Sequence, residues 1–488
     1  MKKSFIYIFS AFCFSCGINS CSFLDENPVD RLVVDNFYTS EKDAQAAVDA
    51  TYQQLNSLYN RLMYMMAELP TDMMKNGLGM PNANLQDLEF LRFNSQNTFV
   101  KDMWKNCYSG ISRANTAIVK IPEIKMNESK KNRLIAEART LRALYYFNLV
   151  RFFGDVPLIL DLKTVEDSKG PRDSKELIYD QIIEDLTFAE EHLPLRSEYS
   201  ASDEGRINKG AAKILFGKVY LTKGDFQKAK DKLAEVVEHE SEYGFGLHKD
   251  YHANWLRDTE AGIEAVLYIQ HNGEMALAGP KYSIPGSLGI SALNEADIPT
   301  QELYDQFDNR DLRKKTNFKT EFAHLKTGEI LKSSIPLSGK FWVEGLETGD
   351  RCDVNMHIIR YADAILMYAE ALNEVGESTK ALAMLNRIRE RAFGDDSGNF
   401  KPMSKDEFRT AILNERRLEF PHEGHRWFDL VRTGTFIQRM KEHSAYEAKV
   451  AEANKTEIAQ NIKEHMILMP IPQSEIDLNP NLVQNAGY

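Results

Sequence analysis

The stretch KGAAKILFGKVYLTKGDFQKAKDKLAEVV, residues 209–237, decides the fold. Its first half places small or apolar side chains three and four positions apart, at Ala212, Leu215, Phe216 and Val219. This spacing lines one face of an α-helix, because a helix turns once every 3.6 residues. A turn at 224–225 follows, and the pattern then resumes at Ala229, Leu233 and Val236. The stretch therefore predicts two helices that pack as a pair.

A second copy of this pattern begins at Arg360. Its first face is formed by Ile365, Tyr368, Ala369 and Leu372, and after a break at Gly376 its second face is formed by Ala381, Leu385 and Ile388. Ala369 and Ala381 have the same separation as Gly217 and Ala229, and small side chains let two helix axes approach to about 8–10 Å. The order of small, aromatic and turn residues resembles a tetratricopeptide unit, whose period is about 34 residues.

Two earlier helix pairs are less regular. A helix over 43–58 has its expected partner over 99–121, and a helix over 137–153, stopped by the GDVP sequence at 154–157, has its partner over 175–193. In each of these pairs an insertion stands in place of a tight turn. Long insertions between regular elements are usually functional or disordered, and residues 72–97 and 271–340 are the main candidates for functional segments. The sequence predicts a mostly α fold of tetratricopeptide-like helix-pair repeats, with long loop insertions and minor β structure.

The N-terminus has the layout of an export signal. Lys2 and Lys3 precede an apolar run over 5–14, which is too short to span a bilayer but has the length of a signal core. Ile18, Asn19 and Ser20 then lead to Cys21 in an order that resembles a bacterial lipobox, although Asn19 departs from the usual residue. We predict a lipoprotein signal peptide over 1–20 and lipidation of Cys21, with an ordinary secretory peptide as the alternative.

Composition limits the partners of the mature chain. The 488 residues are 43% hydrophobic and 27% charged, an ordinary balance for a globular protein. The net charge is −12, and loss of the two leader lysines makes it −14, which argues against nucleic acid as a partner. No later segment has the 18 or so apolar residues of a spanning helix, so a lipid on Cys21 is the expected membrane attachment. Cys107 and Cys352 remain outside the leader, and their pairing stays open.

Three blocks of sequence go beyond a generic repeat. They are EARTLRALYYF at 137–147 running into RFFGDVP at 151–157, then NERRLEF at 414–420 with EGHRWFDLVR at 423–432, and finally MPIP at 469–472 with the closing Gly487-Tyr488. Together they closely resemble the SusD/RagB family. The resemblance covers nearly all of residues 21–488, with an N-terminal region at about 21–200 and a C-terminal family region at about 260–488.

The resemblance implies a function. Family members are lipid-anchored, surface-exposed binding proteins of the outer membrane, which capture oligosaccharide or glycan fragments and pass them to a SusC-like TonB-dependent transporter. A peptide receptor of the same uptake type is one alternative, and a helical-repeat scaffold that docks proteins is another. No enzyme activity and no cofactor are expected, because the chain has no Gly-rich phosphate loop and no Gly-x-Ser-x-Gly elbow. A pair of glycosidase carboxylates among the 72 acidic residues stays open.

The charged residues of these blocks favour structural roles. His422 and His425 stand three positions apart, whereas a helical zinc-protease site needs its histidines four apart, so no metal site is expected. We interpret a second group as a partly buried ion-pair network that ties the C-terminal helices to the loops: Arg416, Arg417, Glu419, Arg426, Asp429 and Arg432.

Ligand contacts are expected in the insertions, where aromatic rings can stack on sugars and polar groups can bind hydroxyls. We predict six contact residues: Asp72, Asn76, Phe90 and Phe93 in the first insertion, Tyr282 in the second, and Trp342 just after the second. Among the other tryptophans, Trp104 and Trp427 are expected to pack in the interior, as are the aromatic residues at 145–147. The insertions contain few aromatic residues, so a peptide receptor stays as an alternative function.

Overall fold

The computed structural model describes residues 38–76, 82–161, 164, 166, 168–271, 298–323, 329–341, 354–450 and 457–488. The predicted signal peptide and Cys21 lie outside these residues, as do Tyr282, Trp342 and Cys352. Cys107 is buried and unpaired.

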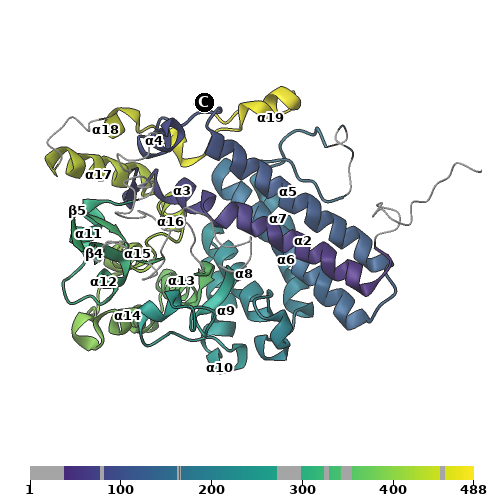
Figure 1. The fold of residues 1–488 in the computed structure, drawn as a ribbon, viewed down its shortest axis with the longest axis horizontal. Coiled ribbons are helices and arrows are strands. Elements are labelled where there is room, and N and C mark those ends of the chain that lie inside the picture. The colour runs from purple at the N-terminus through teal and green to yellow at the C-terminus, as the bar shows by residue number, and fades with distance from the viewer. Residues whose placement is uncertain are drawn as a thin grey trace, which may run out of the picture.

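Four long helices form a row along one side of the molecule: α2 (Glu41–Tyr59), α5 (Thr98–Lys120), α6 (Glu128–Phe153) and α7 (Lys175–His192). α2, α5 and α6 pack against one another, and α6 also packs on α7 (Figure 1). Each helix starts at a polar cap, for example Ser40, whose side chain accepts a hydrogen bond from the Asp43 N–H. α6 ends at Gly154, which has a φ of 72° that favours glycine. Both predicted helix pairs are confirmed.

The two predicted repeats are also present. They consist of α8 (Lys209–Lys223) with α9 (Phe226–Val237), and of α13 (Tyr361–Glu374) with α14 (Ser378–Phe393). A Cβ added at Gly217 would lie 2.5 Å from Leu233 Cγ, so the close approach of α8 and α9 requires glycine there. Ala369 and Ala381 are fully buried. α13 packs on α9 and α8, which joins the two repeats across a long stretch of sequence.

Shorter helices connect these elements. The α-helices are α3 (Leu62–Glu68), α4 (Ala83–Glu89), α10 (Glu240–Tyr243), α11 (Gln301–Gln306), α12 (Arg313–Asn317), α15 (Lys405–Glu419), α16 (Arg426–Arg432), α17 (Phe436–Val450), α18 (Glu457–Asn461) and α19 (Gln473–Leu478). The 3-10 helices are η2 (Ile121–Glu123), η3 (Arg196–Glu198), η4 (Ala201–Asp203), η5 (Tyr251–Trp255), η6 (Asp396–Gly398) and η7 (Glu464–Ile467). None of the described helices is long and apolar enough to cross a membrane.

The β structure is minor, as predicted. Among the described residues it consists of three antiparallel strand pairs: β1 (Met74–Lys75) with β3 (Ile298–Pro299), β2 (Ala265–Ile269) with β6 (Met356–Arg360), and β4 (Phe318–Ala323) with β5 (Ile330–Ser338). The β4–β5 pair lies with α11 and α12 at the end of the molecule away from the row of long helices (Figure 1).

Buried aromatic side chains fill the interior between the helices. Tyr145, Tyr146 and Trp427 are fully buried and Trp104 is 3% exposed, which confirms the predicted packing roles. The C-terminal tail is fixed to this core by Asn485, whose side-chain amide donates hydrogen bonds to the carbonyls of Phe153 and Met469 at 3.0 and 2.7 Å.

Candidate ligand-binding site

The β1–β3 pair brings the ends of two insertions together. The chain enters residues 77–81 just after β1, and it leaves residues 272–297 at the first residue of β3. Lys75 lies opposite Ile298 in the register of the pair. The Thr300 N–H donates to the Met73 carbonyl at 2.9 Å, and the Thr300 hydroxyl donates to the Asp72 carbonyl at 2.9 Å. The chain just before residues 77–81 and the chain just after residues 272–297 are therefore fixed to each other.

The β2–β6 pair adds the third insertion. β2 runs towards residues 272–297, and β6 follows residues 342–353. Ile269 lies opposite Met356, and beyond the strands the His271 N–H donates to Asn355 Oδ1 at 2.9 Å. One end of residues 77–81, both ends of residues 272–297 and one end of residues 342–353 thus adjoin two short strand pairs, which we call the strand roots.

A buried group of charges fixes the first strand root. Asp72, just before β1, is fully buried and binds Arg426 at 2.8 Å, Arg439 at 2.6 Å and Arg417 at 3.1 Å. Arg439 also pairs with Glu302, just after β3. Burial alone would raise the pKa of Asp72, but these arginines hold it well below its usual range. We call these five residues the Asp72 cluster.

A second group, the Arg360 cluster, fixes the other root. Arg360 is the last residue of β6, and it binds Glu423 at 2.7 Å, Glu264 at 2.5 Å and Glu419 at 3.1 Å. Glu264 directly precedes β2, and Lys340, two residues before the third insertion, also binds Glu423 at 2.7 Å. All five side chains are almost completely buried, so each charge depends on its partners.

The ion-pair network predicted from the sequence is confirmed. Arg416 binds Asp363 and Asp429 at 2.7 Å each, and Arg432 binds Asp429 at 2.8 Å. The network reaches further than predicted, because its partners include residues on the strand roots. In the part of the chain that the structure describes, no three histidine, cysteine or acidic side chains are placed to hold a metal ion.

Two of the six predicted contact residues lie in the interior. Both carboxylate oxygens of Asp72 are engaged by arginines. Phe93 is 2% exposed and lies against Trp427, with ring centroids 6.4 Å apart. In this conformation neither side chain has a surface to offer a ligand, because Asp72 fixes a strand root and Phe93 fills the core.

No described contact places the other four predicted contact residues in the interior. Asn76 is partly buried beside β1, and its backbone N–H donates to Glu89. Phe90 is partly buried, with the Arg92 guanidinium 5.0 Å from its ring centroid. Tyr282 and Trp342 lie outside the described residues, in two of the insertions that the strand roots hold. These four remain predictions.

A cavity of about 350 Å³ lies at the end of β2, where the chain enters residues 272–297. Its lining includes Tyr52 and Asn56 on α2, Arg206 after η4, and Tyr268 and Gln270 at the end of β2. The aromatic and amide groups can stack on a sugar ring and bind its hydroxyls, whereas the Arg206 guanidinium already pairs with Asp49, Glu137 and Asp203. No sequence pattern indicates this cavity, since its walls come from three distant segments.

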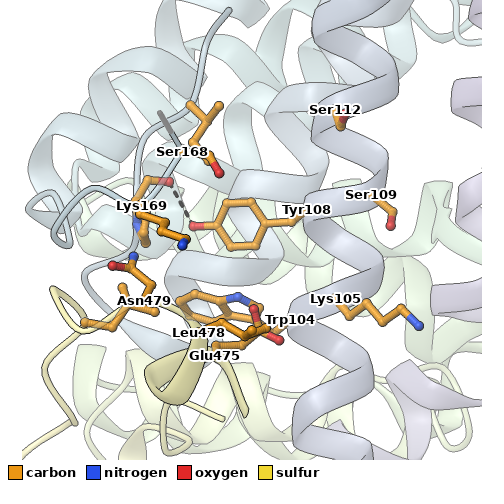
Figure 2. Close-up of a pocket in the computed structure, with 13 residues that line it drawn as sticks. Trp104, Lys105, Tyr108, Ser109, Ser112, Ser168, Lys169, Glu475, Leu478 and Asn479 are labelled. Atoms are coloured by element: carbon orange, nitrogen blue, oxygen red, sulfur yellow. Dashed lines mark hydrogen bonds between the residues drawn. The ribbon is translucent and has the colours of Figure 1, made fainter. Parts of the chain in front are cut away.

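A second cavity, of about 390 Å³, lies between α5 and α19. Figure 2 shows Tyr108 projecting from α5 towards Lys169, while Lys105 points to the opposite side. Tyr108 donates a hydrogen bond to the Pro157 carbonyl at 2.8 Å, and its ring centroid lies 5.1 Å from that of Trp104. Trp104 is almost fully buried, so it forms a wall of this cavity and offers no open stacking face.

Taken together, the helix pairs and the strand roots define a tetratricopeptide-like protein with long insertions on a rigid frame. The model of the SusD family matches residues 332–488, and a family model described as starch-binding associating with outer membrane matches residues 22–221. The SusD-like protein P2 of Formosa agariphila is 30% identical over 96% of this chain and 97% of its own length. The chain therefore belongs to the SusD/RagB family.

Solved structures agree with this assignment. A SusD homolog from Bacteroides thetaiotaomicron has a TM-score of 0.81 at 24% identity, over 94% of this chain and 99% of that one. A laminarin binding SusD-like protein has a TM-score of 0.74 at 27% identity, over 92% of this chain and all of that one. The predicted fold class is confirmed.

Proposed function

We propose that this chain is a lipid-anchored, surface-exposed glycan receptor of an outer-membrane nutrient-uptake system. The observation that carries the proposal is that residues 77–81, 272–297 and 342–353 each adjoin one of two strand roots, and that buried charges hold both roots. Binding residues are commonly carried on loops that a rigid scaffold positions, as here. The starch-binding description of one matching family model and the laminarin-binding neighbour support a glycan as the ligand.

The ligand contacts come from the insertions. Asn76, Phe90, Tyr282 and Trp342 supply one amide and three aromatic rings, which suit hydroxyl groups and the apolar face of a sugar. Fixed strand roots lower the entropy cost of ligand binding, because the frame that carries the contacts is already in place. The cavity at the end of β2 extends the site with further amide and aromatic groups. The protein binds its ligand and leaves it chemically unchanged.

The lipid anchor and the transporter complete the proposal. Acylation of Cys21 tethers the receptor to the outer membrane, and the multiple acyl chains of a bacterial lipoprotein hold a protein there stably. A SusC-like TonB-dependent transporter then receives the captured glycan fragment. The matching family model described as associating with the outer membrane supports this location.

Loop exchange tests the proposed site. Residues 272–297 are replaced by a Gly-Ser segment of equal length, which preserves both strand roots, and residues 451–456 between α17 and α18 are replaced in the same way as a matched control. Calorimetry then measures binding of a glycan selected on an array. We expect the first variant to lose at least 10-fold in affinity and the control to match the wild type.

Two outcomes of this experiment contradict the proposal. Equal glycan affinity of both variants and the wild type would remove the insertions from the site. Loss of peptide binding in the first variant, with no glycan bound by the wild type, would establish the peptide receptor instead.

A further inference from the structure

A third cavity, of about 430 Å³, has no residue of the strand roots in its lining. Its walls are Arg151 at the end of α6, Lys175 and Tyr179 at the start of α7, Lys223 at the end of α8, and Phe428 on α16. The cavity is larger than a bare inorganic anion needs, and it falls within the size range of small-molecule sites.

Arg151 is held rigidly in this cavity. Its Cζ atom lies 3.9 Å from the ring centroid of Phe147 and 3.7 Å from that of Phe428, so the guanidinium is held between two rings. Nε donates to the Phe147 carbonyl at 3.0 Å, and Nη2 donates to Asn148 Oδ1 at 2.6 Å. These contacts fix the position of the group without neutralising its charge.

No carboxylate of the described residues lies within 4 Å of the Arg151 guanidinium. Asp363 and Asp429 contribute to its electrostatic surroundings, but both are bound directly by Arg416. Other well-buried guanidinium groups of this protein have acidic partners, such as Arg142 with Asp185 at 2.7 Å. Arg172 and Arg196 are likewise bound by carbonyl and amide oxygens only, but neither of them lines this cavity, as Arg151 does beside two lysines.

The surroundings of Arg151 add to the positive charge. Lys175 and Lys223 also have no acidic partner within 4 Å among the described residues, and the only carboxylate lining the cavity there is Glu176. Together with Arg151, these two lysines and Glu176 carry a net charge of +2, in a chain whose net charge is −12. Burial lowers the pKa of Arg151 to about 10, so the group stays charged at neutral pH.

We propose that this cavity binds the carboxylate of an acidic sugar, a uronic acid unit. A guanidinium can bind a carboxylate through two parallel hydrogen bonds, and the two lysines add attraction at the rim. The hydroxyls of Tyr179 and Thr222 and the apolar surface of Phe428 suit the rest of the sugar ring. The site is distinct from the strand roots, so it can be tested apart from the proposed receptor site.

Calorimetry on the mature chain tests this site with galacturonate and glucuronate, and with galactose, glucose and sodium sulfate as comparison ligands. We expect the uronates to bind at least 10-fold more tightly than the neutral sugars and more weakly in high salt. Arg151→Gln should lose about 10-fold or more in uronate affinity, and Arg151→Lys should lose less. Lys101→Gln, an exposed change on α5, serves as the matched control.

The remaining outcomes are decisive as well. Equal binding of uronates and neutral sugars, or unchanged uronate affinity of Arg151→Gln, would overturn the proposal. Sulfate binding without uronate binding would show an anion site and refute the sugar assignment. Should Arg151→Gln fold poorly, the surface variant Lys175→Gln/Lys223→Gln replaces it, with an expected loss of about 2- to 5-fold.

Discussion

Arg360→Met tests whether the Arg360 cluster stabilises the fold and its strand roots. The arginine is fully buried, and methionine has a similar shape without the charge. Its loss removes one cation from three buried carboxylates, those of Glu264, Glu419 and Glu423. Each keeps another partner, for example Glu264 with Arg391 at 2.8 Å. Breaking a buried ion pair costs about 3–5 kcal/mol, and we expect a loss of about 4 kcal/mol.

Urea unfolding followed by tryptophan fluorescence measures this loss. The matched control is Arg310→Met, whose partner Asp308 lies 2.8 Å away in an exposed pair on the surface. We expect the control to unfold close to the wild type, because exposed pairs contribute little. If Arg360→Met and Arg310→Met have the same free energy of unfolding, the cluster does not hold the strand roots and the reasoning fails.

The same variant has a distinct dependence on pH. Burial would raise the pKa of Glu419, but Arg391, Arg360 and Arg313 lower it to about 2. A carboxyl with a lowered pKa in the fold stabilises it above the unfolded pKa of about 4.3, and this contribution disappears as the pH falls towards 2. The wild type should therefore lose stability between about pH 5 and 2. Arg360→Met should show a shallower loss, and an equal slope would contradict the assignment.

Three further predictions concern the repeat, the tail and the anchor. Gly217→Val should cost about 2–4 kcal/mol in urea unfolding, because the new side chain meets Leu233, whereas Gly170→Ala, with open space around it, should match the wild type. Asn485→Ala should cost about 1–3 kcal/mol by leaving the Met469 carbonyl unpaired and the Phe153 carbonyl with only its bond from Arg172, and an unchanged unfolding midpoint would show that the tail is not anchored there. Cys21→Ala should keep the ligand affinity seen in calorimetry but reduce uptake by cells, so full uptake by this variant would refute the tether.

The helices could be predicted because their signals are local. In residues 209–237 the apolar spacing, the turn glycine and the small residue at Gly217 lie within one stretch of chain, and each agrees with the structure. The charged block at 414–432 also indicated a buried network, since so many charges of both signs close together need partners.

The strand roots and the interior role of Asp72 could not be predicted in this way. β1 and β3 have two residues each, too few to show any periodicity. Asp72 appeared ligand-facing because it stands in a long insertion, but its partner Arg426 is 354 positions away. A single sequence does not show which distant charges meet. The cavity around Arg151 was missed for the same reason, because one of its two flanking rings comes from Phe428 on α16.

Binding of the mature chain to a glycan array, with a peptide library on the same surface, tests the central claim most directly. We predict that the wild type binds one class of oligosaccharide and no peptide, and that replacement of residues 272–297 removes that signal. Binding to peptides alone, or to nothing on either panel while the protein is folded, would contradict the assignment of this chain as a glycan receptor.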